Sequence, residues 1–373
     1  MERPKLKIGI LTSTRADFGI YQPLLKELEK SPGQYQAELI VFGTHLSQFH
    51  GYTRAEVEKF SSFPIREVYG MPLSDTPQAI ADAYGSLVSN FSQYWASHDY
   101  DWVFALGDRY EMSAAVQAGI PQGIRFAHLH GGETTLGAID NIYRHQISLA
   151  STLHFVATDQ FADRVKEITH SPYVYYVGAL SLDNLSQLKL PSWSTVKEQF
   201  GIDSDDFILC TFHPETVAFG KNAALGQEAS DALAQISESC PVVITMPNAD
   251  TEGTLFRRAF IDLKKQYPAR FFLVESFGRL NYFAAMGQSK FLLGNTSSGI
   301  VEAASFQKYV VNVGDRQKGR PQSNNIINAC FKATAIVEAC TSATEAGIYQ
   351  GENIYHKPGT ATQILKQLND ASI

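Results

Sequence analysis

Several ionisable side chains occur where short apolar runs end, close to glycines. Two such runs, residues 102–106 and 124–127, precede them in the chain. In open α/β sheets, ligands bind beyond the carboxyl ends of the strands, and carboxylates or imidazoles placed there can transfer protons to or from a substrate. The acid/base candidates of this region are Asp108, His130, Glu133 and Asp140.

Two alternatives limit this interpretation. His128 and His130 lie at a strand end and are expected to face opposite sides of the sheet, so a metal bound by both is disfavoured. No other residue spacing supports a metal site, and we predict none. Arg144 and His145 follow Asp140 by four and five residues, so Asp140 could instead be an ordinary helix carboxylate that pairs with one of them.

A second motif, residues 294–299, combines two glycines with three hydroxyl side chains between an apolar run and a helical pattern. Free backbone N–H groups at such a helix start can hold a phosphate. An ordinary helix cap by Ser297 or Ser298 is the alternative, but a cap seldom needs this composition, so we favour phosphate binding. Glu302 could accept hydrogen bonds from ribose hydroxyls, or it could be a surface carboxylate.

Further polar residues follow other predicted strands. The cations of residues 314–320 form either a solvated loop or a set of arginine contacts to phosphate, and both interpretations stay open. His213 ends the apolar run 207–212 and could contact phosphate or transfer a proton. Arg15 and His45 follow the first two predicted strands.

Short apolar runs and helical patterns alternate along the chain, which predicts parallel sheets covered by helices on both faces. The pattern is interrupted near Trp193 and then repeats. We therefore predict an α/β protein with two Rossmann-like domains, residues 1–189 and 190–373, facing each other across a cleft. The last helix, near 360–368, could pack on either domain. No GxGxxG or GxxxxGK[ST] motif supports a dinucleotide or P-loop site.

The composition excludes several classes of protein. Of 373 residues, 44% are hydrophobic and 18% are charged, as in a folded globular protein, and the net charge of −7 argues against nucleic-acid binding. The four cysteines are widely spaced, so we expect no disulfides, and Cys210 is predicted to be a buried apolar residue. We also expect no membrane span and no signal segment, and therefore a cytoplasmic protein.

Taken together, the motifs resemble the hydrolysing UDP-N-acetylglucosamine 2-epimerases, and most closely the bacterial branch that supplies sialic-acid-type or legionaminic-acid-type sugars. The resemblance covers residues 5 to about 320 and depends on Ser13–Asp17, Gly43–His45, Gly107–Arg109, His130–Glu133, Phe212–Glu215, Gly294–Gly299 and Gly314–Arg320. It implies two domains of glycosyltransferase-B type, a homo-oligomer (dimer or tetramer), a UDP-sugar substrate, and no metal or cofactor. It also implies release of UDP and N-acetylmannosamine through a 2-acetamidoglucal.

The resemblance also implies roles for individual residues. Asp108 and Asp140 match acid/base positions, and His213 matches a histidine near the phosphates. Many family members have a glutamate where this chain has His130, so the base is either His130 or Glu133. The expected binding residues are Arg15, Asp17, His45, Arg109, Asn248, Thr296, Ser297, Ser298, Glu302 and Arg316. Alternatives are the same reaction on nucleotide-linked N,N'-diacetylbacillosamine, a retaining glycosyltransferase, and a nucleotide-sugar-binding regulator without catalysis.

Overall fold

The structure, a computed structural model, describes residues 4–47, 52–70, 74, 76–215, 217, 220–247 and 253–371. Its contacts divide the chain into two compact units. Unit 1 comprises Met1–Glu133, Asp140–Ser186 and Tyr355–Ile373, and unit 2 comprises Thr134–Ile139 and Gln187–Ile354. The expected boundary between residues 189 and 190 lies close to Gln187. The chain also enters unit 2 briefly after Glu133, and its last segment belongs to unit 1.

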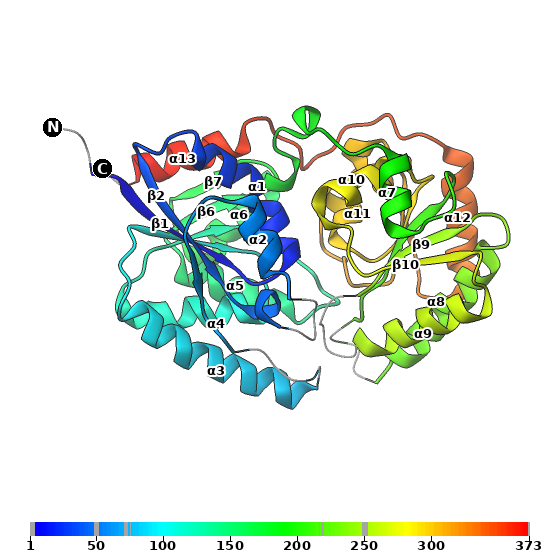
Figure 1. Cartoon of the computed structure of the whole chain (residues 1–373), viewed down its shortest axis with the longest axis horizontal. Coiled ribbons are helices and arrows are strands. Elements are labelled where there is room, and N and C mark those ends of the chain that lie inside the picture. The colour runs from blue at the N-terminus through cyan, green and yellow to red at the C-terminus, as the bar shows by residue number, and fades with distance from the viewer. Residues whose placement is uncertain are drawn as a thin grey trace. The chain divides into compact units, whose positions relative to one another are not determined.

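Unit 1 is built on a seven-stranded parallel sheet in the order β3-β2-β1-β4-β5-β6-β7. Figure 1 labels four of these strands, β1, β2, β6 and β7, together with the helices of the unit. Its strands are β1 (Leu6–Thr12), β2 (Tyr35–Val41), β3 (Ile65–Glu67), β4 (Trp102–Leu106), β5 (Phe126–Leu129), β6 (Leu153–Val156) and β7 (Val174–Tyr176). Its helices are α1 (Arg15–Glu29), α2 (Arg54–Phe60), α3 (Pro77–Trp95), α4 (Tyr110–Gly119), α5 (Asp140–Ala150), α6 (Asp159–Thr169) and α13 (Thr360–Asp370). Short 3-10 turns are η1 (Gly43–Leu46), η3 (Ile120–Gln122), η4 (Leu180–Leu182) and η5 (Leu185–Gln187), the last at the unit boundary.

Both faces of this sheet are buried, which explains why its strands are continuous apolar runs. Along β4, Trp102 and Phe104 join a core with α1 and α13, whereas Val103 and Ala105 join a core with α3 and α4. The side chains alternate between the faces because successive residues of a strand point in opposite directions. The helical layers therefore hold the strand ends, and the residues that follow them, in fixed positions.

Unit 2 contains a six-stranded sheet in the order β10-β9-β8-β11-β12-β13, in which all pairs are parallel. Its strands are β8 (Ile208–Thr211), β9 (Val242–Thr245), β10 (Phe271–Val274), β11 (Leu292–Gly294), β12 (Val310–Val313) and β13 (Ile326–Ala329). Its helices are α7 (Trp193–Phe200), α8 (Asn222–Ile236), α9 (Gly253–Gln266), α10 (Gly278–Gln288), α11 (Ser297–Val301) and α12 (Ala333–Ala346), with the 3-10 turn η6 (Ala303–Phe306).

The predicted fold class is confirmed, since each unit is a Rossmann-like parallel sheet with helices on both faces. Some elements differ from the sequence prediction. The strand expected at 124–127 lies two residues later, and the helical pattern that follows the 294–299 motif is divided into α11 and η6. The sheet-edge strands β3, β7 and β13 were not predicted, because they are short and only partly buried. No helix among the described residues has both the length and the apolar character needed to cross a membrane.

Candidate functional site

The loop after β1 is organised by Asp17, which lies in the first turn of α1 and is only 5% exposed. Its carboxylate accepts hydrogen bonds from the backbone N–H groups of Ser13 (2.9 Å) and Thr14 (3.0 Å) and from the hydroxyls of Ser13 and Thr12. Burial raises the pKa of Asp17, while these hydrogen bonds act in the opposite direction. The Asp17 carboxylate thus shapes the loop that carries Arg15; its role as a ligand contact stays a prediction.

His45 is buried in the same region. Its Nε2 lies 3.0 Å from the Thr12 hydroxyl and its Nδ1 lies 2.8 Å from the Thr53 hydroxyl. Burial lowers the pKa of His45 to about 4, so the ring is neutral near pH 7. In the described structure His45 supports the first two strand ends, and substrate binding by His45 stays a prediction.

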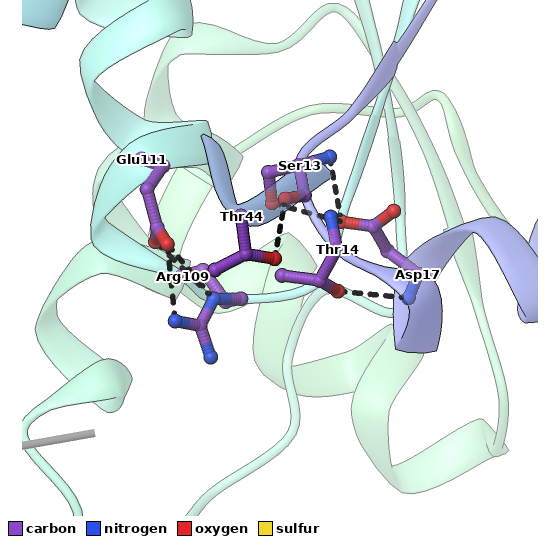
Figure 2. Close-up of polar contacts among 6 residues, drawn as sticks. All are labelled: Ser13, Thr14, Asp17, Thr44, Arg109 and Glu111. Carbon is purple, nitrogen blue, oxygen red and sulfur yellow. Dashed lines mark hydrogen bonds and ion pairs between the residues drawn. The ribbon is translucent and has the colours of Figure 1, made fainter. Parts of the chain in front are cut away.

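Figure 2 shows how the loops after β1, β2 and β4 are held by polar contacts. The Thr44 hydroxyl donates to the Ser13 carbonyl (3.0 Å), and Gly43, with φ of +63°, lies so close to Ser13 that a Cβ there would stand 2.7 Å from its carbonyl oxygen. Arg109 pairs with the fully buried carboxylate of Glu111 (3.0 Å). Because Glu111 holds its guanidinium, Arg109 is preorganised beside the strand end.

Asp108 follows β4, and its carboxylate pairs with the guanidinium of Arg144 in α5. The Arg144 side chain is 2% exposed and that of Asp108 is 24% exposed, so the acid faces solvent more than its partner does. Nε and Nη1 of Arg144 are buried without a hydrogen-bond partner. Arg144 thus pairs with a residue far away in sequence, a contact that helical spacing did not indicate. Asp140 lies in the first turn of α5 and is partly exposed.

His128 points into the interior at the end of β5. Its Nε2 lies 2.9 Å from the Gly107 carbonyl and its Nδ1 lies 3.0 Å from the Ser148 hydroxyl. The carbonyl can only accept, so Nε2 carries the proton and Nδ1 accepts from Ser148. Burial lowers the pKa of His128 to about 3. This neutral ring therefore ties the residue before Asp108 to α5.

His130 follows the end of β5, and its ring contacts Glu133, whereas the ring of His128 contacts Gly107 and Ser148. The expectation that strand geometry separates this pair was wrong, because residues two apart in a regular strand face the same side. The φ of His130, +62°, is unusual for a residue with a side chain. Nδ1 of the ring lies 2.9 Å from Oε1 of Glu133, which is 3% exposed, and Nε2 is buried without a hydrogen-bond partner. A carboxylate accepts the Nδ1 proton, which leaves the lone pair on Nε2. This pair can act as an oriented general base.

In unit 2, the corresponding strand ends are joined by amide and arginine side chains. Asn295 follows β11 and is completely buried, and its side chain makes two hydrogen bonds to the backbone of His213. The Asn295 carbonyl accepts from Arg316 (3.2 Å) and Gln317 (2.8 Å), which follow β12. The candidates His213 and Arg316 are thus brought to one end of this sheet.

The 294–299 motif differs in detail from the prediction. The cap of α11 is Thr296, whose hydroxyl accepts from the Ser298 N–H, rather than Ser297 or Ser298. Helix α11 has only five residues, so a helix dipole contributes little here. Gly294 has φ of +136°, and a Cβ there would stand 1.9 Å from the Thr211 carbonyl oxygen. Glu302 is buried rather than a surface carboxylate.

Asn248 lies outside the described residues. All four cysteines are free, and Cys210 is fully buried, as predicted. Four residues that take part in the strand-end contacts were not predicted as site residues, because their partners are distant in sequence. They are Arg144, Ser148, Asn295 and Gln317.

Comparisons with known proteins show strong similarity over almost the whole chain. Residues 26–369 match the family described as UDP-N-acetylglucosamine 2-epimerase. A UDP-N,N'-diacetylbacillosamine 2-epimerase (hydrolyzing) of Legionella pneumophila is 33% identical over 97% of this chain and 96% of its own length. The polysialic acid biosynthesis protein P7 of Escherichia coli is 28% identical over 98% of this chain and 94% of its own.

Solved structures show the same fold at lower sequence identity. The UDP-GlcNAc 2-epimerase of Neisseria meningitidis, solved with bound UDP-GlcNAc, has a TM-score of 0.79 at 18% identity, covering 98% of this chain and 100% of that one. The two-sheet architecture is therefore that of the glycosyltransferase-B-like epimerase structures.

Proposed function

This chain belongs to the UDP-N-acetylglucosamine 2-epimerase family, and we propose that it is a hydrolysing 2-epimerase that converts UDP-N-acetylglucosamine and water into UDP and N-acetylmannosamine. The observation that carries the proposal is the family match over residues 26–369. The His130–Glu133 pair next to the strand end that carries Asp108 supports it, since the reaction needs proton transfer at carbon.

In the proposed reaction, a base removes the proton from C2 of the sugar while the bond from C1 to the UDP oxygen breaks. The electron pair of the C–H bond forms the C1–C2 double bond of a 2-acetamidoglucal, and UDP leaves with the bonding pair from C1. Water then adds its hydroxyl to C1, and a proton is delivered to C2 on the opposite face. The product is free N-acetylmannosamine.

We assign the C2 base to His130 and an orienting role to Glu133. The assignment is supported by the 2.9 Å contact of Nδ1 with the Glu133 carboxylate and by the unpartnered, buried Nε2. A neutral imidazole is a suitable base near pH 7. Asp108 and Asp140 are proposed to supply the second proton transfer, with Arg144 holding the Asp108 carboxylate in place.

The diphosphate is proposed to be bound in unit 2 by His213, Arg316 and the 294–299 loop, and a phosphate contact of Arg15 stays a prediction. Arginine suits this role because its planar guanidinium can donate two parallel hydrogen bonds to phosphate oxygens. Fixed donors around the departing diphosphate would stabilise the charge that develops as the C1–O bond breaks. A homo-oligomeric state and independence from cofactors stay predictions from the family resemblance, and a cytoplasmic location stays a prediction from the sequence.

A second candidate substrate is UDP-linked N,N'-diacetylbacillosamine. Two relatives are named for this sugar, at 33% and 30% identity, and the second, from Campylobacter jejuni, is named for GDP-linked and UDP-linked forms. The two substrates differ at C4 and C6, so the chemistry at C1 and C2 would be the same. Values of kcat/KM measured side by side on both sugars decide between them.

Incubation with UDP-N-acetylglucosamine in the absence of any acceptor tests the proposed reaction. We expect UDP and free N-acetylmannosamine in equal amounts, measured by chromatography and NMR. Turnover only after addition of an acceptor would identify a glycosyltransferase. A product that keeps its nucleotide would identify an epimerase that does not hydrolyse the sugar–phosphate bond.

A further inference from the structure

Asn295 in unit 2 has an arrangement of hydrogen bonds that an ordinary buried amide does not require. The paired strands β8 and β11 end at Thr211 and Gly294. Beyond this point, Oδ1 of Asn295 accepts from the His213 N–H (2.7 Å) and Nδ2 donates to the His213 carbonyl (2.9 Å). The side-chain amide thus makes the two hydrogen bonds that a peptide group would make if the pairing of β8 and β11 continued. It holds the His213 backbone at two points.

The main chain of Asn295 extends this link to the loop after β12. Its carbonyl oxygen accepts from Nε2 of Gln317 (2.8 Å) and from Nη1 of Arg316 (3.2 Å). Gln317 is only 1% exposed, and its Oε1 accepts from Nη1 of Arg320 (2.9 Å). One buried residue therefore connects the histidine that follows β8 with the arginine-containing loop that follows β12.

The close approach of the strands fixes this connection. The Asn295 N–H donates to the Thr211 carbonyl (3.1 Å), and Gly294 leaves no room for a side chain against that same carbonyl. The side-chain amide of Asn295 is therefore held in place, and so are the groups that are hydrogen-bonded to it. An amide side chain that is hydrogen-bonded through both its oxygen and its nitrogen is held in one orientation, which suits a group that must position a ligand contact.

We propose that Asn295, with Gln317, is a positioning residue that fixes the His213 backbone and the Arg316 guanidinium for binding the diphosphate of the nucleotide. The proposal deepens the proposed function and rests on it. Arginine can adopt many rotamers, so an arginine held before binding loses less freedom when it meets a phosphate. Asn295 does not need to touch the nucleotide to act in this way.

The test compares the affinities of Asn295→Ala and the wild-type protein for UDP and for uridine by calorimetry. Alanine keeps the main-chain carbonyl that Arg316 and Gln317 contact, so this variant loses only the two side-chain hydrogen bonds to the His213 backbone. We expect it to weaken UDP binding about tenfold, because His213 is no longer held in position for the diphosphate, and to leave uridine binding nearly unchanged. Gln317→Ala removes one of the two hydrogen bonds that join the loop after β12 to the Asn295 carbonyl and keeps the bond from Arg316, so it should shift UDP affinity in the same direction by less. A purely structural role would lower the unfolding temperature without changing this UDP-to-uridine preference.

Asn325→Ala is the matched control. Asn325 is also a completely buried amide of unit 2, and its Nδ2 donates to the Lys308 carbonyl away from the strand ends that carry His213. We expect this variant to lose stability and to keep UDP affinity. Equal UDP affinity of Asn295→Ala, Gln317→Ala and wild type would overturn the inference and leave the proposed function intact.

If Asn295→Ala does not fold, Gln317→Ala carries the test, and an unchanged UDP-to-uridine preference in that variant would contradict the proposal. If the wild-type protein itself binds no UDP, the proposed function fails, and the positioning role fails with it.

Discussion

The two units share one sheet topology but place different chemistry at their strand ends. The first six strands of unit 1 and the six strands of unit 2 follow the same order, with the first strand in the middle and the third at one edge. In unit 1 the strand ends carry His45, Asp108, His128 and His130, whereas His213 is the single histidine in the sequence of unit 2. Function therefore depends on the residues after the strands and not on the fold.

The way in which each unit holds these residues also differs. In unit 1, carboxylates, arginines and imidazoles hold one another, as in the Asp108–Arg144 and His130–Glu133 pairs. In unit 2, the amides of Asn295 and Gln317 hold a histidine backbone and an arginine. The difference suggests that unit 1 carries proton transfer and unit 2 carries anion binding, and the following variants test this division.

The largest effect is expected for Asp108→Asn. An amide cannot take up or release a proton at neutral pH, so kcat should fall about 10²–10⁴-fold, the usual contribution of a positioned acid or base. UDP affinity, measured by calorimetry, should be retained. Asp163→Asn, a change at an exposed carboxylate of α6, should leave both quantities unchanged. Near-wild-type turnover of Asp108→Asn would remove Asp108 from the mechanism.

Acid should destabilise unit 1 more than unit 2. Burial lowers the pKa values of His45 and His154 to about 4 and that of His128 to about 3. An unfolded histidine binds a proton below about pH 6.5, and these folded histidines do not until nearer pH 4. Stability is therefore present above pH 6.5 and is lost as the pH falls below it, by roughly 2 kcal/mol for each ring at pH 4.5.

Urea unfolding at pH 7 and pH 4.5 measures this difference. Tryptophan fluorescence follows each unit separately. In a variant with phenylalanine at positions 95 and 102, Trp193 reports the unfolding of unit 2. In Trp193→Phe, the two remaining tryptophans, Trp95 and Trp102, report the unfolding of unit 1. The unit 1 midpoint should fall more on acidification. Burial raises the pKa of Asp17, so acidification favours the folded state at this one residue, but three histidines have the opposite effect. Equal shifts of both midpoints would contradict the prediction.

A smaller effect, on binding, is expected for Arg316→Ala in unit 2. Loss of charged hydrogen bonds to phosphate should raise the Kd for UDP about tenfold to hundredfold. The value of kcat at saturating substrate should change much less. Arg257→Ala, which removes a partly exposed arginine paired with Glu275 in the same unit, is the matched control. A loss of kcat without a loss of UDP affinity would place Arg316 in the chemistry instead.

The smallest effect is expected for Glu133→Gln. The carbonyl oxygen of the introduced glutamine can still accept the Nδ1 proton of His130, so the tautomer is kept, but the negative charge that stabilises the imidazolium is lost. We expect kcat to fall about tenfold, corresponding to about 1.4 kcal/mol, with unchanged UDP affinity. A fall as large as that of a His130→Asn variant would instead identify Glu133 as the base; asparagine suits the positive φ at that position.

The sequence was sufficient to predict the two sheets, because both faces of each sheet are buried and the strands are therefore apolar runs. Glycines and ionisable residues after those runs also marked the ends of most strands, although the strand expected at 124–127 ends two residues later. The contacts among them could not be predicted from spacing. Arg144 reaches Asp108 and Asn295 reaches His213 only because distant strands lie side by side, and helical spacing does not indicate either contact.

Deuterium incorporation at C2 tests most directly the proposal that the reaction removes the C2 proton of the sugar, because it reports the breaking of the C2–H bond itself. UDP-N-acetylglucosamine is converted in D₂O, and the released sugar is examined by NMR. Removal of the C2 proton and later addition of solvent across the double bond predict N-acetylmannosamine with one deuterium at C2. Free sugar that keeps its original proton at C2 would contradict the account.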